Sequence, residues 1–287
     1  MGIPKSNLKE FLNENKGYKL YKRCEYTTLI KLPDGSLLKI LDDVLLIKLF
    51  NTGYDLETRL NEVHKLTDFS NFAWPTRMLE EDGIVKAYTM REIPGVNFTF
   101  YYENIFDLYS YANIHSQFEN NIKEGNNVGI VFPDLCTTEN IRITPDNKVV
   151  FIDYDGLQIN KMPAIRFSSF LGEPEEVLTK KYYDYESGLF TKELDVKSAI
   201  FLYFVDVFEI DLSSVNKVDP YSHQKVTLDE IFSMIGLDDD DIKQKIWKLF
   251  QPTIPNEFLG DDLYKIAEKY KLIEPFPDSP IKTLIKK

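Results

Sequence analysis

The chain has 287 residues, of which 43% are hydrophobic and 28% are charged, and its formal net charge is −12 at pH 7. This length and composition predict a folded protein of two domains or two lobes and argue against disorder as the main state. The negative charge disfavours general binding to nucleic acid and to anionic membrane surfaces, because both carry phosphate groups.

Cysteine usage and the N-terminal segment indicate the compartment. Two cysteines, Cys24 and Cys136, cannot form a disulfide framework, and they lack the C-x-x-C spacing of zinc sites. The first residues lack the apolar segment of a signal peptide, and no run approaches the ~18 apolar residues of a membrane helix. We therefore expect a cytoplasmic protein without a membrane partner. Gly2 and Ser6 match a myristoylation pattern, but a match this short often arises by chance.

The first part of the chain predicts strands. Residues 26–32 and 36–41 are rich in β-formers and flank Pro-Asp-Gly at 33–35, which predicts a hairpin. A third short apolar run, residues 44–50, is interpreted as a further strand. Two more strands, 75–78 and 84–93, flank a Glu-Asp-Gly turn.

One helix interrupts these strands, over residues 54–66. Its apolar side chains, Leu56, Leu60 and Val63, are spaced four and three residues apart and form one helical face. Asp55 is the expected N-cap. Residues 1–93 are thus predicted to form a small antiparallel sheet with one helix.

The rest of the chain, residues 94–287, is predicted to be mostly helical. The expected helices are 106–118, a buried apolar helix at 195–208, and surface helices at 226–235, 238–250 and 261–270. Within this region, residues 140–143 and 148–152 form a predicted strand pair around Thr-Pro-Asp-Asn. The overall expectation is an α+β fold with two lobes.

Four polar residues stand where chemistry is expected. Asp134 and Asn140 precede a predicted strand, and Asp153 ends the apolar run Val-Val-Phe-Ile. Carboxylate and amide oxygens are suitable ligands for Mg²⁺. Lys39 lies inside the apolar strand Leu-Leu-Lys-Ile-Leu, where an ammonium group needs an anionic partner unless its stem reaches water from an edge strand. Glu57 and Glu62 of the predicted helix are the two candidates for that partner, and Glu57 is preferred.

This order of residues resembles the protein-kinase-like superfamily, including divergent bacterial Ser/Thr kinase-like proteins. Asn140 and Asp153 are separated as in that family, and Asp153-Tyr154-Asp155 stands where kinases carry Asp-Phe-Gly. Three further segments look similar: Gly172 to Leu178 to the Ala-Pro-Glu region, Asp195 to Ser198 to the segment that anchors the catalytic loop, and Met90 to Gly95 to the adenine-binding hinge. The resemblance covers about residues 18–270.

The resemblance implies a role for each matching residue. Asp134 would orient or deprotonate a hydroxyl group, and Asn140 and Asp153 would hold Mg²⁺. Lys39, fixed by Glu57, would hold the phosphates of ATP, and Met90, Glu92 and Ile93 would contact the nucleotide. Asp195 would accept backbone N–H groups of the catalytic loop. Cys136 has no basic neighbour to activate it, and His115 is expected to be a packed or surface residue. Asp155 is a candidate for a second metal ligand, although a residue of this kind is more often a solvated turn residue.

The sequence also departs from the family pattern. Five residues, not four, separate Asp134 from Asn140, and Phe132-Pro133 replaces the usual His-Arg. No glycine-rich loop occurs between Tyr18 and Leu32. We therefore keep three functions open. The first is an ATP- and Mg²⁺-dependent Ser/Thr protein kinase acting on a protein substrate. The second is a pseudokinase that binds or regulates a protein partner, and the third is a small-molecule kinase of the aminoglycoside or choline type.

Overall fold

The computed structural model describes residues 2–66, 71–98, 100–101, 108–135, 140–153, 156–165, 179–215 and 226–270. They form an α+β protein, as expected, and the chain divides into two units. Unit 1 consists of Met1–Asn97, Asn127–Ile130 and Glu139–Arg166. Unit 2 consists of Phe98–Asn126, Val131–Thr138 and Phe167–Lys287.

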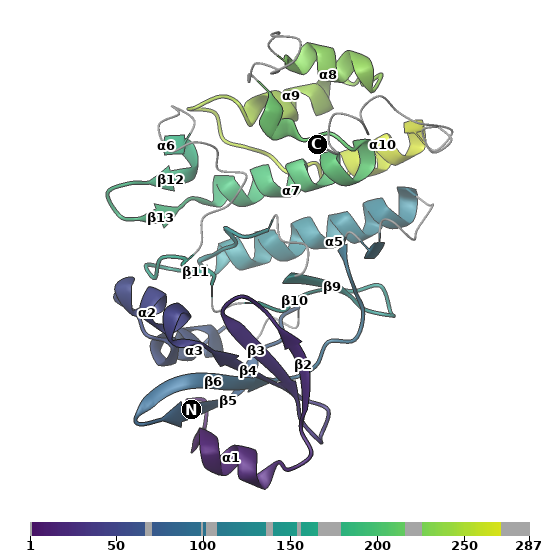
Figure 1. The fold of residues 1–287 in the computed structure, drawn as a ribbon. Helices are drawn as coiled ribbons and strands as arrows, with labels where there is room; N and C mark the ends of the chain where they lie inside the picture. Colours follow the sequence, from purple (N-terminus) through teal and green to yellow (C-terminus); the bar gives the residue numbers. More distant parts are fainter. Residues whose placement is uncertain are drawn as a thin grey trace. The chain divides into compact units, whose positions relative to one another are not determined.

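A six-stranded sheet in the order β1-β5-β6-β4-β3-β2 is the main element of unit 1 (Figure 1). Its strands are β1 (Lys5–Asn7), β2 (Lys19–Arg23), β3 (Thr27–Lys31), β4 (Leu37–Leu41), β5 (Pro75–Glu81) and β6 (Ile84–Met90). The sheet is mixed, which corrects the expectation of an antiparallel sheet. β1 runs parallel to β5, with Lys5 opposite Met78, while the other pairs are antiparallel. The N-terminal residues carried no strand signal, so only pairing with β5 defines β1.

Both predicted hairpin turns are present. Gly35 follows Pro33 and Asp34 with a φ of 87° and donates its N–H to the carbonyl oxygen of Leu32, closing the β3–β4 turn. In the β5–β6 turn, Asp82 and Gly83 both have positive φ values, of 53° and 79°. Such turns match the twist of the flanking strands. The turn residues thus help to determine the register of β3 with β4 and of β5 with β6.

Three helices of unit 1 accompany the sheet: α1 (Leu8–Glu14), α2 (Asp43–Asn51) and α3 (Leu56–His64). The prediction of a strand at residues 44–50 is wrong, because α2 occupies this segment. Asp42 caps α2 by accepting the N–H of Leu45 at 2.8 Å, and the buried residues Leu45 and Leu49 lie four positions apart. A short apolar run is compatible with the periodicity of a strand and with that of a helix. The N-cap and the burial of one side favour the helix here.

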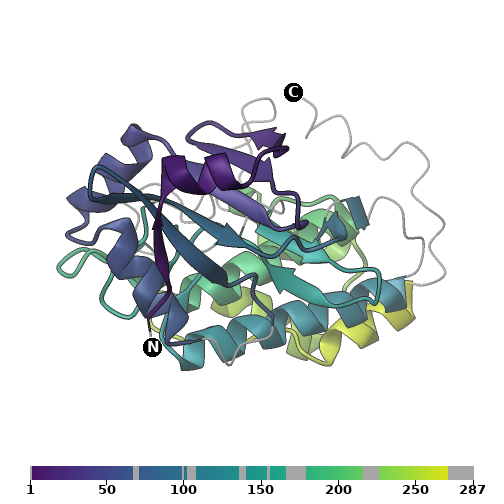
Figure 2. The ribbon, with the colours of Figure 1, turned by 90° about the horizontal axis from the view of Figure 1, so that it is seen from below.

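The helix expected over residues 54–66 is confirmed as α3. Asp55 accepts the N–H of Thr58, and Leu56, Leu60 and Val63 are buried as predicted. Helix α1 packs on the sheet, where Leu8 and Phe11 join Ile30, Leu38 and Leu79 in one hydrophobic cluster (Figure 2). Burying apolar side chains on the sheet stabilises this small helix, which is too short to be stable alone.

A second, three-stranded sheet completes unit 1. Its strands are β7 (Val96–Asn97), β9 (Ile141–Ile143) and β10 (Val149–Phe151), and β9 lies between the other two. β9 and β10 confirm the predicted strand pair. Gly95 has a φ of 143°, and a Cβ atom there would lie 2.2 Å from the carbonyl oxygen of Ile143. Only glycine therefore allows the chain to approach β9 this closely. The short strand β11 (Gln158–Ile159) pairs with β8 (Ile130–Val131), which begins in unit 1.

Two long antiparallel helices, α5 (Leu108–Asn127) and α7 (Lys192–Phe208), lie side by side in unit 2 (Figure 1). Hydrogen bonds at both ends align the two helices: Tyr111 donates to Asp206, and Asn126 donates to Asp195. Helix α7 is buried almost all round, as its apolar sequence predicted. Helix α5 extends beyond residue 118, where the sequence reading ended it.

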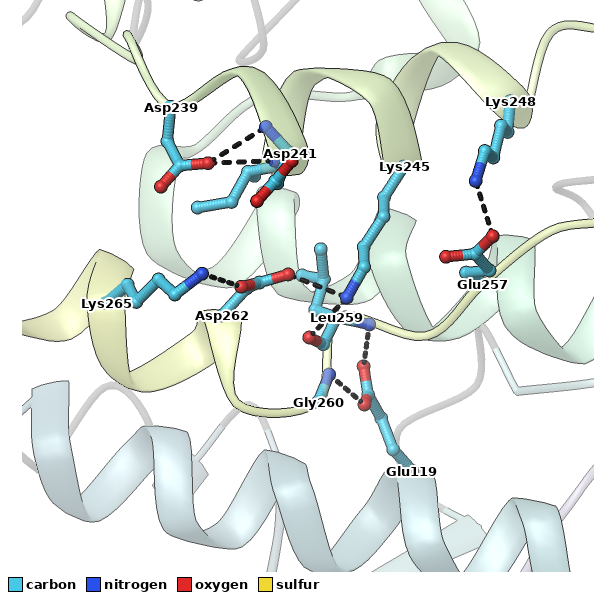
Figure 3. A network of polar contacts seen from close by, with 11 residues as sticks. Glu119, Asp239, Asp241, Lys245, Lys248, Glu257, Leu259, Gly260, Asp262 and Lys265 are labelled. Carbon is cyan, nitrogen blue, oxygen red and sulfur yellow. Dashed lines mark hydrogen bonds and ion pairs between the residues drawn. The ribbon is translucent and has the colours of Figure 1, made fainter.

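The other elements of unit 2 are short. They are α6 (Thr179–Tyr182), β12 (Tyr183–Asp184), β13 (Leu189–Phe190), η2 (Leu212–Ser214), α8 (Leu228–Met234), α9 (Asp240–Lys248) and α10 (Asp262–Tyr270). Figure 3 shows polar contacts that link α5, α9 and α10. The buried carboxylate of Glu119 accepts the N–H groups of Leu259 and Gly260 at 3.1 and 2.8 Å. The run of aspartates at 238–241 starts α9, and Asp239 is its N-cap. Among the described residues, no helix combines the length and the apolar character needed to cross a bilayer.

Candidate functional site

Lys39 lies in the middle of β4, between two neighbouring strands. Its register partners are Leu29 on β3 and Tyr88 on β6, and the residue is only 5% exposed. The hairpin turn at residues 33–35 sets the register of β4 against β3, and the alternation of β4 places Lys39 on one face of the sheet. A lysine buried to this extent requires an anionic partner, because an unpaired ammonium group inside a protein is costly.

Asp153 supplies that partner. Lys39 Nζ lies 2.8 Å from Asp153 Oδ1, although 114 positions separate the two residues in the chain. Strand β10 delivers the carboxylate to this position, because it ends two residues earlier, at Phe151. The exposed fraction is 6% for the lysine side chain and 32% for the aspartate side chain. The ammonium group of Lys39 is therefore shielded from water, while the carboxylate of Asp153 is still in contact with solvent.

The expected pairing of Lys39 with a glutamate of α3 is not the one observed. Glu57 instead pairs with Lys5 of β1 at 2.5 Å, and Glu62 pairs with Lys65, one helical turn away. The reason is the orientation of α3. Its buried face contains Leu56 and not Glu57, so the carboxylate of Glu57 points to the parallel edge strand, which the sequence reading did not foresee.

A backbone hydrogen bond holds Asn140 beside the residue that precedes Asp153. The carbonyl oxygen of Asn140 accepts the N–H of Ile152 at 3.0 Å, which extends the pairing of β9 with β10. Both Asn140 and Asp153 line the same pocket of unit 1 as Lys39. The sequence prediction that these three polar residues lie together is thus met by the geometry of unit 1.

The pocket also includes the segment that follows β6. Met90, Glu92 and Ile93, the predicted nucleotide contacts, all line it. Glu92 forms an ion pair with Lys31 at 2.5 Å. The remaining lining residues lie on β2, β3, β4 and β9 or close to β2, β5, β6 and β10. They are Tyr21, Lys22, Thr27, Leu29, Leu37 and Arg142 on the strands, and Cys24, Ala73, Arg91 and Ile152 close to them.

Asp134 belongs to unit 2, and its position relative to the pocket of unit 1 stays a prediction. It is half-buried in a turn that follows Phe132. Asp195 holds the start of this turn, as predicted, because its Oδ1 accepts the N–H of Phe132 at 2.9 Å. Asn126 donates a second hydrogen bond to Asp195 at 2.6 Å. Burial raises the pKa of Asp195 to about 7, against the effect of these two donors.

Several predicted features do not contribute to a described site. His115 is packed among aromatic rings such as Phe98 and Tyr203, and burial lowers its pKa to about 3, so it is neutral at pH 7. It is a core histidine. Cys136, Asp155 and residues 172–178 lie outside the described residues.

The structure adds two residues that sequence reasoning missed. Arg59 is 1% exposed and donates to the carbonyl oxygens of Leu157 and Pro163 and to Thr52 Oγ1. Its place on the apolar face of α3, three residues after Leu56, was the available signal. Arg142 lines the pocket, and its signal was the alternation of Ile-Arg-Ile in β9.

The chemistry of the donors fits a nucleotide with a divalent cation. Asn140 and Asp153 provide amide and carboxylate oxygens, the ligands that Mg²⁺ accepts together with phosphate and water oxygens. Within the described ranges, no group of three or more His, Cys, Asp or Glu residues forms a metal cluster. Asn140 and Asp153 would supply two of the Mg²⁺ ligands, and oxygens of a substrate phosphate and of water would supply the others.

Comparison with known proteins does not add a family. No family model matches the chain, and no curated protein matches it.

Proposed function

We propose that the chain is an ATP- and Mg²⁺-dependent phosphotransferase that acts on a hydroxyl group, with a two-lobed kinase-like fold and a Ser or Thr of a protein as its acceptor. The observation that supports this proposal is the buried ion pair of Lys39 and Asp153 in a pocket that Asn140 also lines. A dry lysine beside a carboxylate and an amide is suited to phosphate groups and to the cation that accompanies them.

Each residue has a defined role in this proposal. Lys39 holds the phosphates of the nucleotide, and Asp153 and Asn140 hold Mg²⁺. The segment from Met90 to Ile93 contacts the rest of the nucleotide. Asp134 orients the acceptor hydroxyl, a role that rests on the resemblance in sequence. Bound Mg²⁺ would neutralise charge on the transferred phosphoryl group, and the protein residues would contribute mainly positioning.

The first test is a calorimetric titration of ATP, with and without Mg²⁺, into the wild-type protein and Asp153→Asn. We expect Mg²⁺-dependent binding to the wild type and its loss in the variant. The matched control is Asp146→Asn, which removes an exposed carboxylate in the β9–β10 turn that pairs with Lys148, away from the pocket. Equal binding of Mg·ATP by the wild type and Asp153→Asn would exclude the proposed site.

The second test measures transfer of the γ-phosphate by the pure protein, including autophosphorylation. Transfer to protein substrates supports the Ser/Thr kinase, while transfer to small hydroxyl compounds alone supports a kinase of the aminoglycoside or choline type. In either case Asp153→Asn is expected to abolish transfer without loss of the fold.

A pseudokinase that binds or regulates a protein partner is the second candidate, and one observation favours it. Glu57, which would fix Lys39 in an active kinase, pairs with Lys5 instead. The missing glycine-rich loop and Phe132-Pro133 point in the same direction. ATP binding without any transfer would favour this candidate over the enzyme.

A further inference from the structure

The pocket of unit 1 carries more positive than negative charge. Four of its lining residues are cationic: Lys22, Lys39, Arg91 and Arg142. The two carboxylates among the described lining residues, Glu92 and Asp153, already pair with lysines. The described lining thus differs in charge from the chain as a whole, whose net charge is −12. The excess of positive charge therefore points to a ligand with more than one negative group.

Arg142 stands out among these cations because of its surroundings. It is half-buried, and among the residues that the structure describes its guanidinium has neither a hydrogen-bond acceptor nor an ion-pair partner. By contrast, the buried Arg59 of the same unit donates to three oxygens. A guanidinium has five donors in a rigid fork, and its geometry matches phosphate oxygens.

The strand register explains why Arg142 faces the pocket. It lies in the centre of β9, opposite Val150 on β10 and Asn97 on β7. Its neighbours Ile141 and Ile143 are buried, at 0% and 2% exposure, on the other face of the strand. Alternation therefore places Arg142 on the same side as Asn140, two residues before it. Both residues line the pocket.

We propose that Arg142 is a second anion-binding residue of this pocket and that, together with Lys39, it selects ligands with a chain of two or more phosphate groups. This inference rests on the pocket being the phosphate site of the proposed function, which it deepens. It assigns specificity to a residue outside the matched motif positions. Ligands with one phosphate engage one cation, whereas a diphosphate or triphosphate spans both.

The test measures dissociation constants by calorimetry for inorganic tripolyphosphate, ATP, AMP and adenosine, in the presence of a chelator so that the metal does not contribute. The proteins are the wild type, Arg142→Gln, Arg142→Lys and the control Arg23→Gln. Arg23 lies on β2, is exposed and does not line the pocket, so its variant removes the same charge nearby. Thermal unfolding of each variant verifies that it is folded.

We expect Arg142→Gln to weaken tripolyphosphate and ATP binding about tenfold, since a charge-assisted hydrogen bond is lost. The dissociation constant of adenosine should change less than about twofold in Arg142→Gln, and so should those of all ligands in Arg23→Gln. Arg142→Lys should retain part of the affinity for tripolyphosphate, because lysine keeps the positive charge but lacks the forked donors of arginine. Tripolyphosphate binding that is equal in the wild type and Arg142→Gln overturns the inference, and so does a wild type that does not bind tripolyphosphate.

A measurement on the wild type covers the case in which Arg142→Gln does not fold. Cys24 is exposed and lines the same pocket, so bound tripolyphosphate should slow its alkylation by N-ethylmaleimide, followed by mass spectrometry of the Cys24 peptide. An unchanged alkylation rate at saturating tripolyphosphate contradicts the inference.

The outcomes separate this inference from the proposed function. If Mg·ATP binding and γ-phosphate transfer require Asp153 but not Arg142, the proposed phosphotransferase is supported and the role of Arg142 is contradicted. If tripolyphosphate binding requires Arg142 but the protein transfers no γ-phosphate, the role of Arg142 is supported and the proposed enzymatic activity is contradicted.

Discussion

Lys39 Nζ and Asp153 Oδ1 form an ion pair at 2.8 Å between two residues that are 114 positions apart in the chain. The contact links β4, a central strand of the large sheet of unit 1, to the end of β10 in the small sheet. Because the lysine side chain is buried and the aspartate side chain is partly exposed, a ligand can approach the pair from the carboxylate side.

This pair is expected to show energetic coupling. In a double-mutant cycle with Lys39→Met, Asp153→Asn and the double variant, the coupling free energy should be about 1 kcal/mol, a modest value because the solvent-exposed part of the Asp153 side chain is screened. Urea unfolding of the four proteins measures it. The Asp146–Lys148 pair of the β9–β10 turn is the exposed control, for which we expect less coupling. Fully additive effects at Lys39 and Asp153 would contradict the observed contact.

Nucleotide binding should protect Cys24. Its thiol is exposed and lines the pocket together with Lys39 and Asp153. A ligand in the pocket blocks access to the thiol, so Mg·ATP should slow alkylation of Cys24 by N-ethylmaleimide several-fold, as measured by mass spectrometry. In Asp153→Asn the protection by Mg·ATP should be absent. Protection that persists in this variant would place the nucleotide elsewhere.

Arg59 should be essential for the stability of unit 1. It is 1% exposed and donates to two backbone carbonyl groups, the one of Leu157 in a buried contact and the one of Pro163 in a partly buried contact. Arg59→Met removes these donors and leaves the acceptors without their partner, which should lower the free energy of unfolding by about 3 kcal/mol. Urea unfolding provides the measurement, and Arg23→Met, at an exposed site, should change stability by less than about 0.5 kcal/mol. Similar effects of the two substitutions would show that the buried contacts contribute little.

Glu119 should make stability depend on pH. Burial raises its pKa from 4.5 to about 7 in the folded state, although the N–H groups of Gly260 and Leu259 oppose this change (Figure 3). The folded protein therefore binds a proton more tightly than the unfolded chain between pH 4.5 and about 7. The stabilisation from this proton is present below pH 4.5 and is lost as the pH rises through about 7.

We expect the free energy of unfolding of the wild type to fall over this range, and Glu119→Gln to have a shallower slope, measured by urea unfolding at pH 5, 6, 7 and 8. Part of the slope should remain, because burial also raises the pKa of Asp195 to about 7. Glu230→Gln is the control. Its hydrogen bonds with the backbone and side chain of Thr227 lower the pKa of this exposed carboxyl group, so it contributes in the opposite direction. Identical slopes for the wild type and Glu119→Gln would contradict the raised pKa.

Local patterns in the sequence were enough to predict several elements. Three elements follow from residues that are close together in the chain. They are the hairpin turn at Gly35, the capped helix that begins after Asp55 and the buried helix α7. Caps, turns and hydrophobic periodicity act over short distances, so a single sequence contains them in full. The role of Asp195 as an acceptor for the loop backbone could also be predicted, through the resemblance to a known segment.

Long-range contacts were decided only by the tertiary structure. The run at residues 44–50 fits a strand or a helix, and burial of Leu45 and Leu49 in unit 1 decides for the helix. The partner of Glu57 depends on β1, which pairs in parallel with a strand about 70 residues later, as the register of Lys5 with Met78 shows. Charge and spacing identified Lys39 as a residue that needs an anion. The choice of Asp153 over Glu57 required the positions of β4 and β10 in space, because complementary charges pair by proximity in the fold and not by distance along the chain.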